Sequence, residues 1–139
     1  AKHPVVMVPG IVSTGLELWE GEACAAGYFR QRPWGTLAML RMMLLDKECW
    51  LRHLRILPNG RDPPGIRLRP ARGIEAADWL MPGYWVWARV VENLAELGYD
   101  HDTLLMASYD WRLDVQQLEE RDRYFTRLQA DIELMVQLR

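Results

Sequence analysis

A short apolar run near the N-terminus constrains the fold of this chain more than any other feature. Val5-Val6-Met7-Val8 predicts a fully buried β-strand, and Pro9-Gly10 ends it in a turn. Residues 103–107 form a second run of the same kind, and helical periodicity comes before and after it. Because strands that alternate with helices are typical of α/β proteins, the sequence predicts an α/β fold with a parallel sheet.

Two segments carry apolar residues at helical spacing. One runs from Tyr84 to Leu97, and Gly98 follows it as a helix stop. The other begins after Asp114, which has Gln117 three residues on, in the pattern of a capping box. We expect this segment to continue as one long helix, whose inner face would hold Leu118, Phe125, Leu128, Ile132 and Met135.

Residues 11–82 show no sustained periodicity and are punctuated by glycine, proline and arginine. A loop region of that length inside a compact domain is usually functional, often as a lid or a substrate loop. We expect one short amphipathic helix within it, around Arg41. Its apolar face is expected to consist of Leu37, Leu40, Met43 and Leu44.

The composition is that of a single globular domain covering residues 1–139, with 50% apolar and 26% charged residues. A net charge of −2 provides no basic excess for binding nucleic acid. No apolar run approaches the ~20 residues that a membrane-spanning helix needs. The chain also enters its first strand without a signal peptide, so we expect any membrane anchor of the parent protein to lie outside it.

The turn after the first strand can contribute to catalysis. In α/β-hydrolases, a loop at this point supplies one backbone N–H of the oxyanion hole, and the nucleophile follows on a Gly-x-Ser-x-Gly elbow. Gly10 allows a sharp turn, which leaves the amide of Ile11 able to point into a site. Ser13 and Ser108 are the only serines, and neither lies in such an elbow. We therefore expect a partial α/β-hydrolase fold that is cut before its nucleophile.

Cys24 and Cys49 are the only cysteines, and they flank a lid-like segment, residues 24–49. Their spacing leaves two interpretations open: a disulfide, which would imply an oxidising compartment, or two buried free thiols. A metal site is not expected, because these cysteines and the scattered histidines match no zinc-ligand spacing. We expect His3 to cap the first strand, and we expect His53 and His101 to lie in loops.

Two further motifs surround tryptophans. Arg30-Gln31-Arg32-Pro33-Trp34-Gly35 could meet a lipid surface or cover an acyl chain, although a solvated basic turn is the simpler interpretation. Asp110-Trp111-Arg112 closes the second strand, where an Asp110–Arg112 ion pair could hold the strand end. Asp110 is read as structural rather than as a triad acid, because the hydrolase order places the acid after the serine.

Together these residues resemble the lecithin:cholesterol acyltransferase family, and within it the phospholipid:diacylglycerol acyltransferase branch. The resemblance covers essentially the whole chain in the right order. The matching stretches are residues 3–11, 15–21, 29–32, 34–35, 49–50, 62–67, 82–84, 92–94 and 109–113.

The resemblance implies an enzyme that moves a fatty acyl group from the sn-2 position of a phospholipid to diacylglycerol, forming triacylglycerol through a Ser-Asp-His triad. It implies no cofactor and a place at the lumenal face of the endoplasmic reticulum membrane. By resemblance, Ile11 gives the first oxyanion amide and Trp34 is the lid tryptophan that meets lipid. Cys24 and Cys49 would form the lid disulfide, while Gly10, Asp110 and Arg112 are structural.

The sequence also departs from the family pattern. All three triad residues are missing, so we expect this chain alone to be inactive. Pro33 stands where an aliphatic residue is expected, which affects the detailed shape of the lid. Two other functions stay open at this point: a phospholipase or esterase of the same family, in which water accepts the acyl group, and a non-catalytic lipid-binding product.

Overall fold

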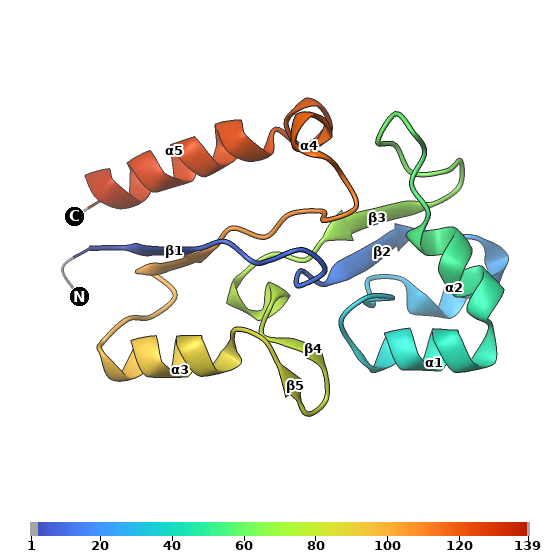
Figure 1. Cartoon of the computed structure of the whole chain (residues 1–139), viewed down its shortest axis with the longest axis horizontal. Helices are drawn as coiled ribbons and strands as arrows, with labels where there is room; N and C mark the ends of the chain where they lie inside the picture. The colour runs from blue at the N-terminus through green and yellow to red at the C-terminus, as the bar shows by residue number, and fades with distance from the viewer. Residues whose placement is uncertain (1–2, 139) are drawn as a thin grey trace.

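The computed structural model describes residues 3–138, and a small parallel sheet lies between helices on either side of it (Figure 1). Strand β1 (Val5–Met7) pairs in parallel with β6 (Leu104–Met106), in the register Val5↔Leu104 and Met7↔Met106. The predicted parallel α/β arrangement is confirmed. The burial predicted for the whole first run is wrong at its end, because β1 stops at Met7 and the side chain of Val8 is 52% exposed.

Alternate residues of β1 face different helices, as the two-residue period of a strand requires. Val5 and Met7 pack with Val91 and Leu94 of α3 (Ala88–Glu96). Val6 packs instead in the cluster formed by α4 (Val115–Asp122) and α5 (Tyr124–Gln137). Both faces of the short sheet are therefore covered, which explains why its strands are apolar throughout.

Helix α3 begins four residues later than the periodicity predicts, although it ends as expected before Gly98, whose φ is 84°. The difference arises because β5 (Tyr84–Trp85) pairs antiparallel with β4 (Trp79–Met81) in a hairpin. Gly83 has a φ of 83° in the connecting turn, a conformation that glycine adopts without strain. Pro82-Gly83 is thus the turn of a hairpin whose second strand, β5, occupies the start of the segment predicted to be helical.

The single long helix predicted after Asp114 is wrong, because Arg123 interrupts it in the left-handed conformation with a φ of 53°. The capping box of Asp114 and Gln117 starts α4 as predicted. A second cap starts α5, since the Glu119 carboxylate accepts hydrogen bonds from the amides of Phe125 and Thr126. The break turns α5 so that it runs beside β1 and β6 (Figure 1).

Residues 11–82 are largely structured, contrary to the expectation of a long loop region. Strand β2 (Leu16–Glu20) pairs antiparallel with β3 (Arg67–Pro70), and the two short helices α1 (Leu37–Leu45) and α2 (Lys47–Leu54) lie between them in the chain. Two 3₁₀ turns, η1 (Ala23–Tyr28) and η2 (Ile74–Ala76), complete the segment. Leu16, Leu18, Met42, Cys49 and Leu68 belong to its own apolar core.

The helix predicted around Arg41 exists as α1, but its buried face is the opposite one. Ala38, Met39 and Met42 are buried, whereas Leu37 is 62% and Leu44 is 84% exposed. Small and flexible side chains therefore face the core, and several leucines face outward. Within residues 3–138, no helix has both the length and the apolar character needed to cross a bilayer.

Candidate active site

The candidate site is the turn that leaves the carboxyl end of β1. The amide of Ser13 donates a 3.1 Å hydrogen bond to the carbonyl of Gly10, which closes a reverse turn over residues 10–13. Val12, the third residue of this turn, has a φ of 61°, a conformation that type II turns reserve for glycine. For a β-branched residue such a φ is a strained outlier, and strain of this kind concentrates at functional sites.

Ile11 occupies the second position of the turn. Its side chain is 72% exposed, and no described residue accepts a hydrogen bond from its amide. A backbone N–H that has no internal acceptor and sits beside the carboxyl end of a parallel strand can donate to a bound oxyanion. The structure thus places Gly10 and Ile11 as the sequence predicts, while the role of the Ile11 amide stays a prediction.

Two indole groups hold the turn in place. Trp34 donates a 2.8 Å hydrogen bond from Nε1 to the carbonyl of Val12, and Trp111 donates a 3.2 Å bond to the carbonyl of Thr14. The two rings lie 4.9 Å apart, and Trp34 is stacked on Trp50 at 6.3 Å. We call Trp34, Trp50 and Trp111 the tryptophan cluster. Its hydrogen bonds fix the carbonyl of Val12 within the turn and the carbonyl of Thr14 just after it. The tryptophan cluster therefore limits the movement of the turn.

The residues after the turn are anchored from two other segments. Thr14 is fully buried, and its hydroxyl accepts a hydrogen bond from the amide of Tyr109. Gly15 donates to Ala76 and accepts from Ala71, each at 2.8 Å. Gly35 lies so close that an added Cβ would come within 3.1 Å of the Gly15 Cα. A side chain at position 35 would press against this backbone and would also be strained, because Gly35 has a φ of 96°.

Cys24 and Cys49 form a disulfide, which closes the lid-like segment at its base. Next to it lies His53, and its predicted position in a loop is wrong, because it lies in α2 and is fully buried. The Nδ1 of His53 is 2.7 Å from the carbonyl of Cys49, and its Nε2 accepts a 3.1 Å hydrogen bond from the Glu22 amide. Both sulfur atoms and both ring nitrogens are therefore already engaged, although these three side chains are close enough together to suggest a metal site.

Trp34 lies in the middle of the lid-like segment and is half-buried in the tryptophan cluster. Its contact with lipid stays a prediction. A shallow apolar cavity of about 340 Å³ lies beside it, lined by Gly35, Thr36, Leu37, Trp79, Met81 and Pro82. The exposed apolar side chains of this region thus belong to α1 and the β4–β5 hairpin.

The predicted ion pair between Asp110 and Arg112 is present, with 2.7 Å between the charged atoms. Arg121 pairs with the same carboxylate at 2.8 Å, and Arg112 also pairs with Asp62 at 3.0 Å. Burial raises the pKa of the Asp110 carboxyl, but the hydrogen bonds and charges of Arg112 and Arg121 outweigh it and hold that pKa below its usual range. Both carboxylate oxygens are saturated by arginine, as a structural role requires.

Sequence reasoning missed Asp62 and Arg121 as members of this network. They come from a proline-rich loop and from α4, and no local spacing connects either of them to Asp110. The available signals were indirect: an aspartate that stands before two prolines in a loop, and an arginine on the inner side of an amphipathic helix.

Comparison with known proteins places these features in a family. The model of the lecithin:cholesterol acyltransferase family matches residues 28–139. The phospholipid:diacylglycerol acyltransferase of Schizosaccharomyces pombe is 54% identical over 132 residues, which cover 94% of this chain and 21% of that protein. The protein of the same name from Saccharomyces cerevisiae is 50% identical, over 99% of this chain and 22% of its own length.

A more distant relative is the human phosphatidylcholine-sterol acyltransferase, 31% identical over 96% of this chain and 33% of that protein. The chain therefore spans about a fifth of the length of the two yeast relatives and a third of the human one.

Proposed function

We propose that this chain, which belongs to the lecithin:cholesterol acyltransferase family, supplies the first oxyanion amide of an enzyme that moves a fatty acyl group from a phospholipid to diacylglycerol. The observation that carries the proposal is the amide of Ile11, which has no acceptor among the described residues and lies in a strained turn held by two indoles. The 50–54% identity to proteins named phospholipid:diacylglycerol acyltransferase favours diacylglycerol over a sterol as the acceptor.

In the proposed reaction, a serine hydroxyl outside residues 1–139 loses its proton to a histidine and attacks the sn-2 ester carbonyl of the phospholipid. The carbonyl oxygen becomes an oxyanion, to which the Ile11 amide donates a hydrogen bond. Collapse of this intermediate breaks the sn-2 ester bond, and the leaving oxygen takes the proton from the histidine, so that a lysophospholipid departs and an acyl-enzyme remains. The hydroxyl of diacylglycerol then attacks the acyl-enzyme, so that triacylglycerol leaves and the serine is restored.

The complete domain is proposed to be an α/β-hydrolase in which β1 and β6 are neighbouring strands of a larger parallel sheet. In that fold the loop after one strand contributes an oxyanion amide, and the nucleophile elbow follows another strand. The parallel pairing of β1 with β6 and the position of the Gly10–Ser13 turn support this assignment.

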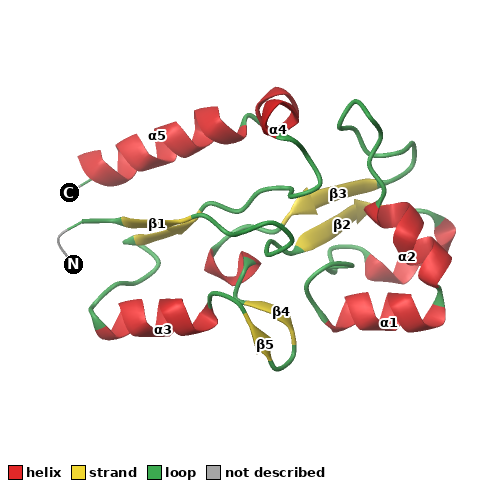
Figure 2. Ribbon diagram, in the orientation of Figure 1, coloured by secondary structure: helices red, strands yellow, loops and turns green. Residues whose placement is uncertain are grey.

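A membrane surface is the proposed location of the substrates. Leu37, Leu44 and Leu45 of α1 are 62%, 84% and 72% exposed, and Tyr84 and Trp85 of the β4–β5 hairpin are 61% and 52% exposed. These two elements lie near one another along one side of the molecule (Figure 2), with the shallow apolar cavity between them. Exposed leucines beside aromatic side chains suit the boundary between acyl chains and headgroups.

The proposed compartment is the lumenal face of the endoplasmic reticulum membrane. The Cys24–Cys49 disulfide supports this proposal, because disulfides persist in oxidising compartments. In this arrangement the lid-like segment would rest on the membrane through α1, while its base is held by the disulfide.

The test is a pair of substitutions at Ile11 in the full-length protein. Ile11→Pro removes the amide hydrogen but keeps the turn, because proline is favoured at the second position of a type II turn. We expect kcat for acyl transfer to fall by about 10²–10³, the usual effect of losing one oxyanion donor. Ile11→Ala changes only an exposed side chain and should retain kcat. Equal rates for both variants would contradict the assigned role of this amide.

A further inference from the structure

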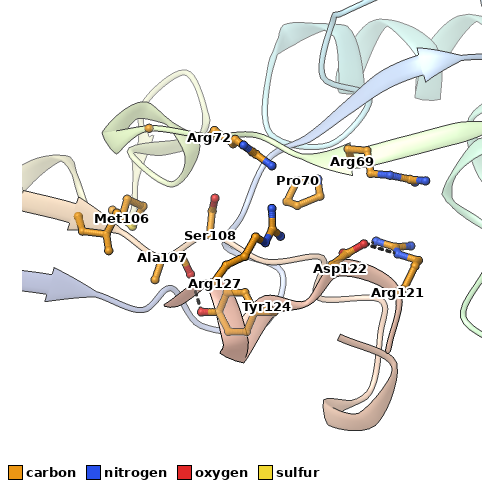
Figure 3. Close-up of a pocket in the computed structure, with 12 residues that line it drawn as sticks. Arg69, Pro70, Arg72, Met106, Ala107, Ser108, Arg121, Asp122, Tyr124 and Arg127 are labelled. Atoms are coloured by element: carbon orange, nitrogen blue, oxygen red, sulfur yellow. Dashed lines mark hydrogen bonds and ion pairs between the residues drawn. The ribbon is translucent and has the colours of Figure 1, made fainter. Parts of the chain in front are cut away.

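A cavity of about 470 Å³ lies at the carboxyl end of β6, outside the turn described above (Figure 3). Its walls come from three segments distant in the sequence: the end of β3 and the residues after it, the end of β6 through Ser108, and the junction of α4 and α5. A cavity of this size can hold a small-molecule group.

Four arginines line this cavity, and two of them have no carboxylate partner. Arg69 pairs with Asp62, and Arg121 pairs with Asp110 and Asp122. Among the described residues, no carboxylate lies within ion-pair distance of Arg72 or Arg127. Figure 3 shows these two side chains extending toward one another from opposite walls. The cavity thus concentrates positive charge in a chain whose net charge is −2.

The cavity is linked by hydrogen bonds to the segment that follows the proposed oxyanion turn. Because β1 and β6 are parallel, Ile11 and Ser108 both leave the sheet at its carboxyl edge, where α/β folds bind ligands. The hydroxyl of Ser108 donates a 2.6 Å hydrogen bond to the carbonyl of Ala71, and the amide of Ala71 donates to Gly15 at the exit of the turn. One wall of the cavity and the turn are therefore parts of a single hydrogen-bonded unit.

We propose that Arg72 and Arg127 bind the phosphate of the phospholipid acyl donor, an assignment that rests on the proposed function. A guanidinium group donates two parallel hydrogen bonds to phosphate oxygens, and two such groups can hold one phosphodiester from opposite sides. Asp122 also lines the cavity, but its carboxylate is paired with Arg121 at 2.7 Å and so adds little repulsion. Phosphate held here would direct the glycerol esters of the same lipid toward the adjacent turn.

The kinetic test compares Arg72→Gln, Arg127→Gln and the double variant in the full-length protein. For phosphatidylcholine in neutral vesicles we expect kcat/KM to fall by about tenfold for each arginine, as for the loss of a charged hydrogen bond. For a soluble p-nitrophenyl ester, which has no phosphate, kcat/KM should be unchanged. Arg55→Gln, an exposed arginine outside the cavity, is the matched control and should leave both rates unchanged. Equal losses on both substrates would overturn the proposal.

A binding test does not depend on catalysis. Isothermal titration should show that glycerophosphocholine binds the wild-type protein and does not bind the double variant. Binding of inorganic phosphate without glycerophosphocholine would make the cavity a free-anion site and overturn the lipid assignment, as would binding of neither. A protein that binds glycerophosphocholine here but transfers no acyl group would instead leave the cavity assignment intact and contradict the proposed function.

Discussion

The indole of Trp34 donates a 2.8 Å hydrogen bond to the carbonyl of Val12, a β-branched residue held at a φ of 61°. Trp34 lies within the disulfide-closed lid-like segment, and Val12 lies in the turn that would bind the oxyanion. This hydrogen bond thus connects the two parts of the proposed site. Any movement of the lid-like segment that breaks this bond would release the strained turn.

We expect Trp34→Phe to lower kcat by about tenfold, because the donor that holds Val12 is lost and the proposed oxyanion amide would be misplaced, although an aromatic ring remains. The loss should be the same for vesicle phospholipid and for a soluble ester. Val12→Gly should restore part of the rate in the double variant, since glycine adopts a positive φ without strain. Steady-state kinetics on both substrates checks these outcomes.

A different result would assign Trp34 to lipid contact. If Trp34→Phe reduced the rate on vesicles alone, and Val12→Gly restored nothing, then the hydrogen bond would have no part in positioning the turn. Trp50→Phe is the control within the tryptophan cluster, because its Nε1 donates to Pro33 and not to the turn.

The disulfide is expected to stabilise the lid-like segment. Its loop of 25 residues predicts a loss of about 3 kcal/mol in the free energy of unfolding for Cys24→Ser or Cys49→Ser. Chemical denaturation of the full-length variants measures this loss. Rapid labelling of both cysteines by a thiol reagent in the native wild-type protein, without reductant, would show that the bond is absent in solution.

The buried network at Asp110 predicts an acid-dependent loss of stability. The pKa of Asp110 is lowered on folding, so its charge stabilises the protein above the ordinary value of 3.8, and this stabilisation is lost as the pH falls through the lowered pKa. Asp110→Asn leaves the Arg112 charge buried without its main partner, and should cost about 3–5 kcal/mol at neutral pH.

Unfolding free energies measured across the acid range check this assignment. The wild-type protein should lose stability steeply below the ordinary pKa of aspartate, and Asp110→Asn should show a shallower dependence there. Identical pH slopes for the two proteins would show that Asp110 is not a group whose ionisation stabilises the fold.

Exposed leucines on α1 are expected to determine vesicle binding. Leu44 is 84% exposed, so Leu44→Glu should leave stability nearly unchanged but weaken binding to lipid vesicles by at least about tenfold, the effect of losing one buried leucine. Leu97→Glu, at a leucine just beyond α3 that is 71% exposed, is the matched control. Vesicle sedimentation measures both, and equal losses would mean that α1 has no special contact with the membrane.

Much of the fold around the sheet could be predicted because its signals are local. The apolar runs of β1 and β6, the capping box at Asp114 and the helix stop at Gly98 each depend on neighbouring residues. The break at Arg123 could not be found in the same way. It depends on the Glu119 cap and on the tertiary contact of Tyr124 with the carbonyl of Ala107.

The residues of the candidate site also differ in whether the local sequence could predict them. Gly10 and Ile11 follow a strand and were visible in the sequence, whereas the contacts of Trp34 with Val12 and of Arg112 with Asp62 join residues 22 and 50 positions apart. The inner face of α1 was predicted wrongly because leucine spacing cannot distinguish a face that packs inside from one that faces outward. Such faces are decided by what the rest of the chain places against them.

The most direct test of the whole account is the fate of a label in the sn-2 acyl group of phosphatidylcholine. The phospholipid and unlabelled diacylglycerol are presented in vesicles to the full-length protein, and the lipid products are separated. We predict labelled triacylglycerol, formed together with an equal amount of lysophospholipid and only when diacylglycerol is present. Label that appears solely as free fatty acid, whatever the amount of diacylglycerol, would contradict acyl transfer and identify a phospholipase.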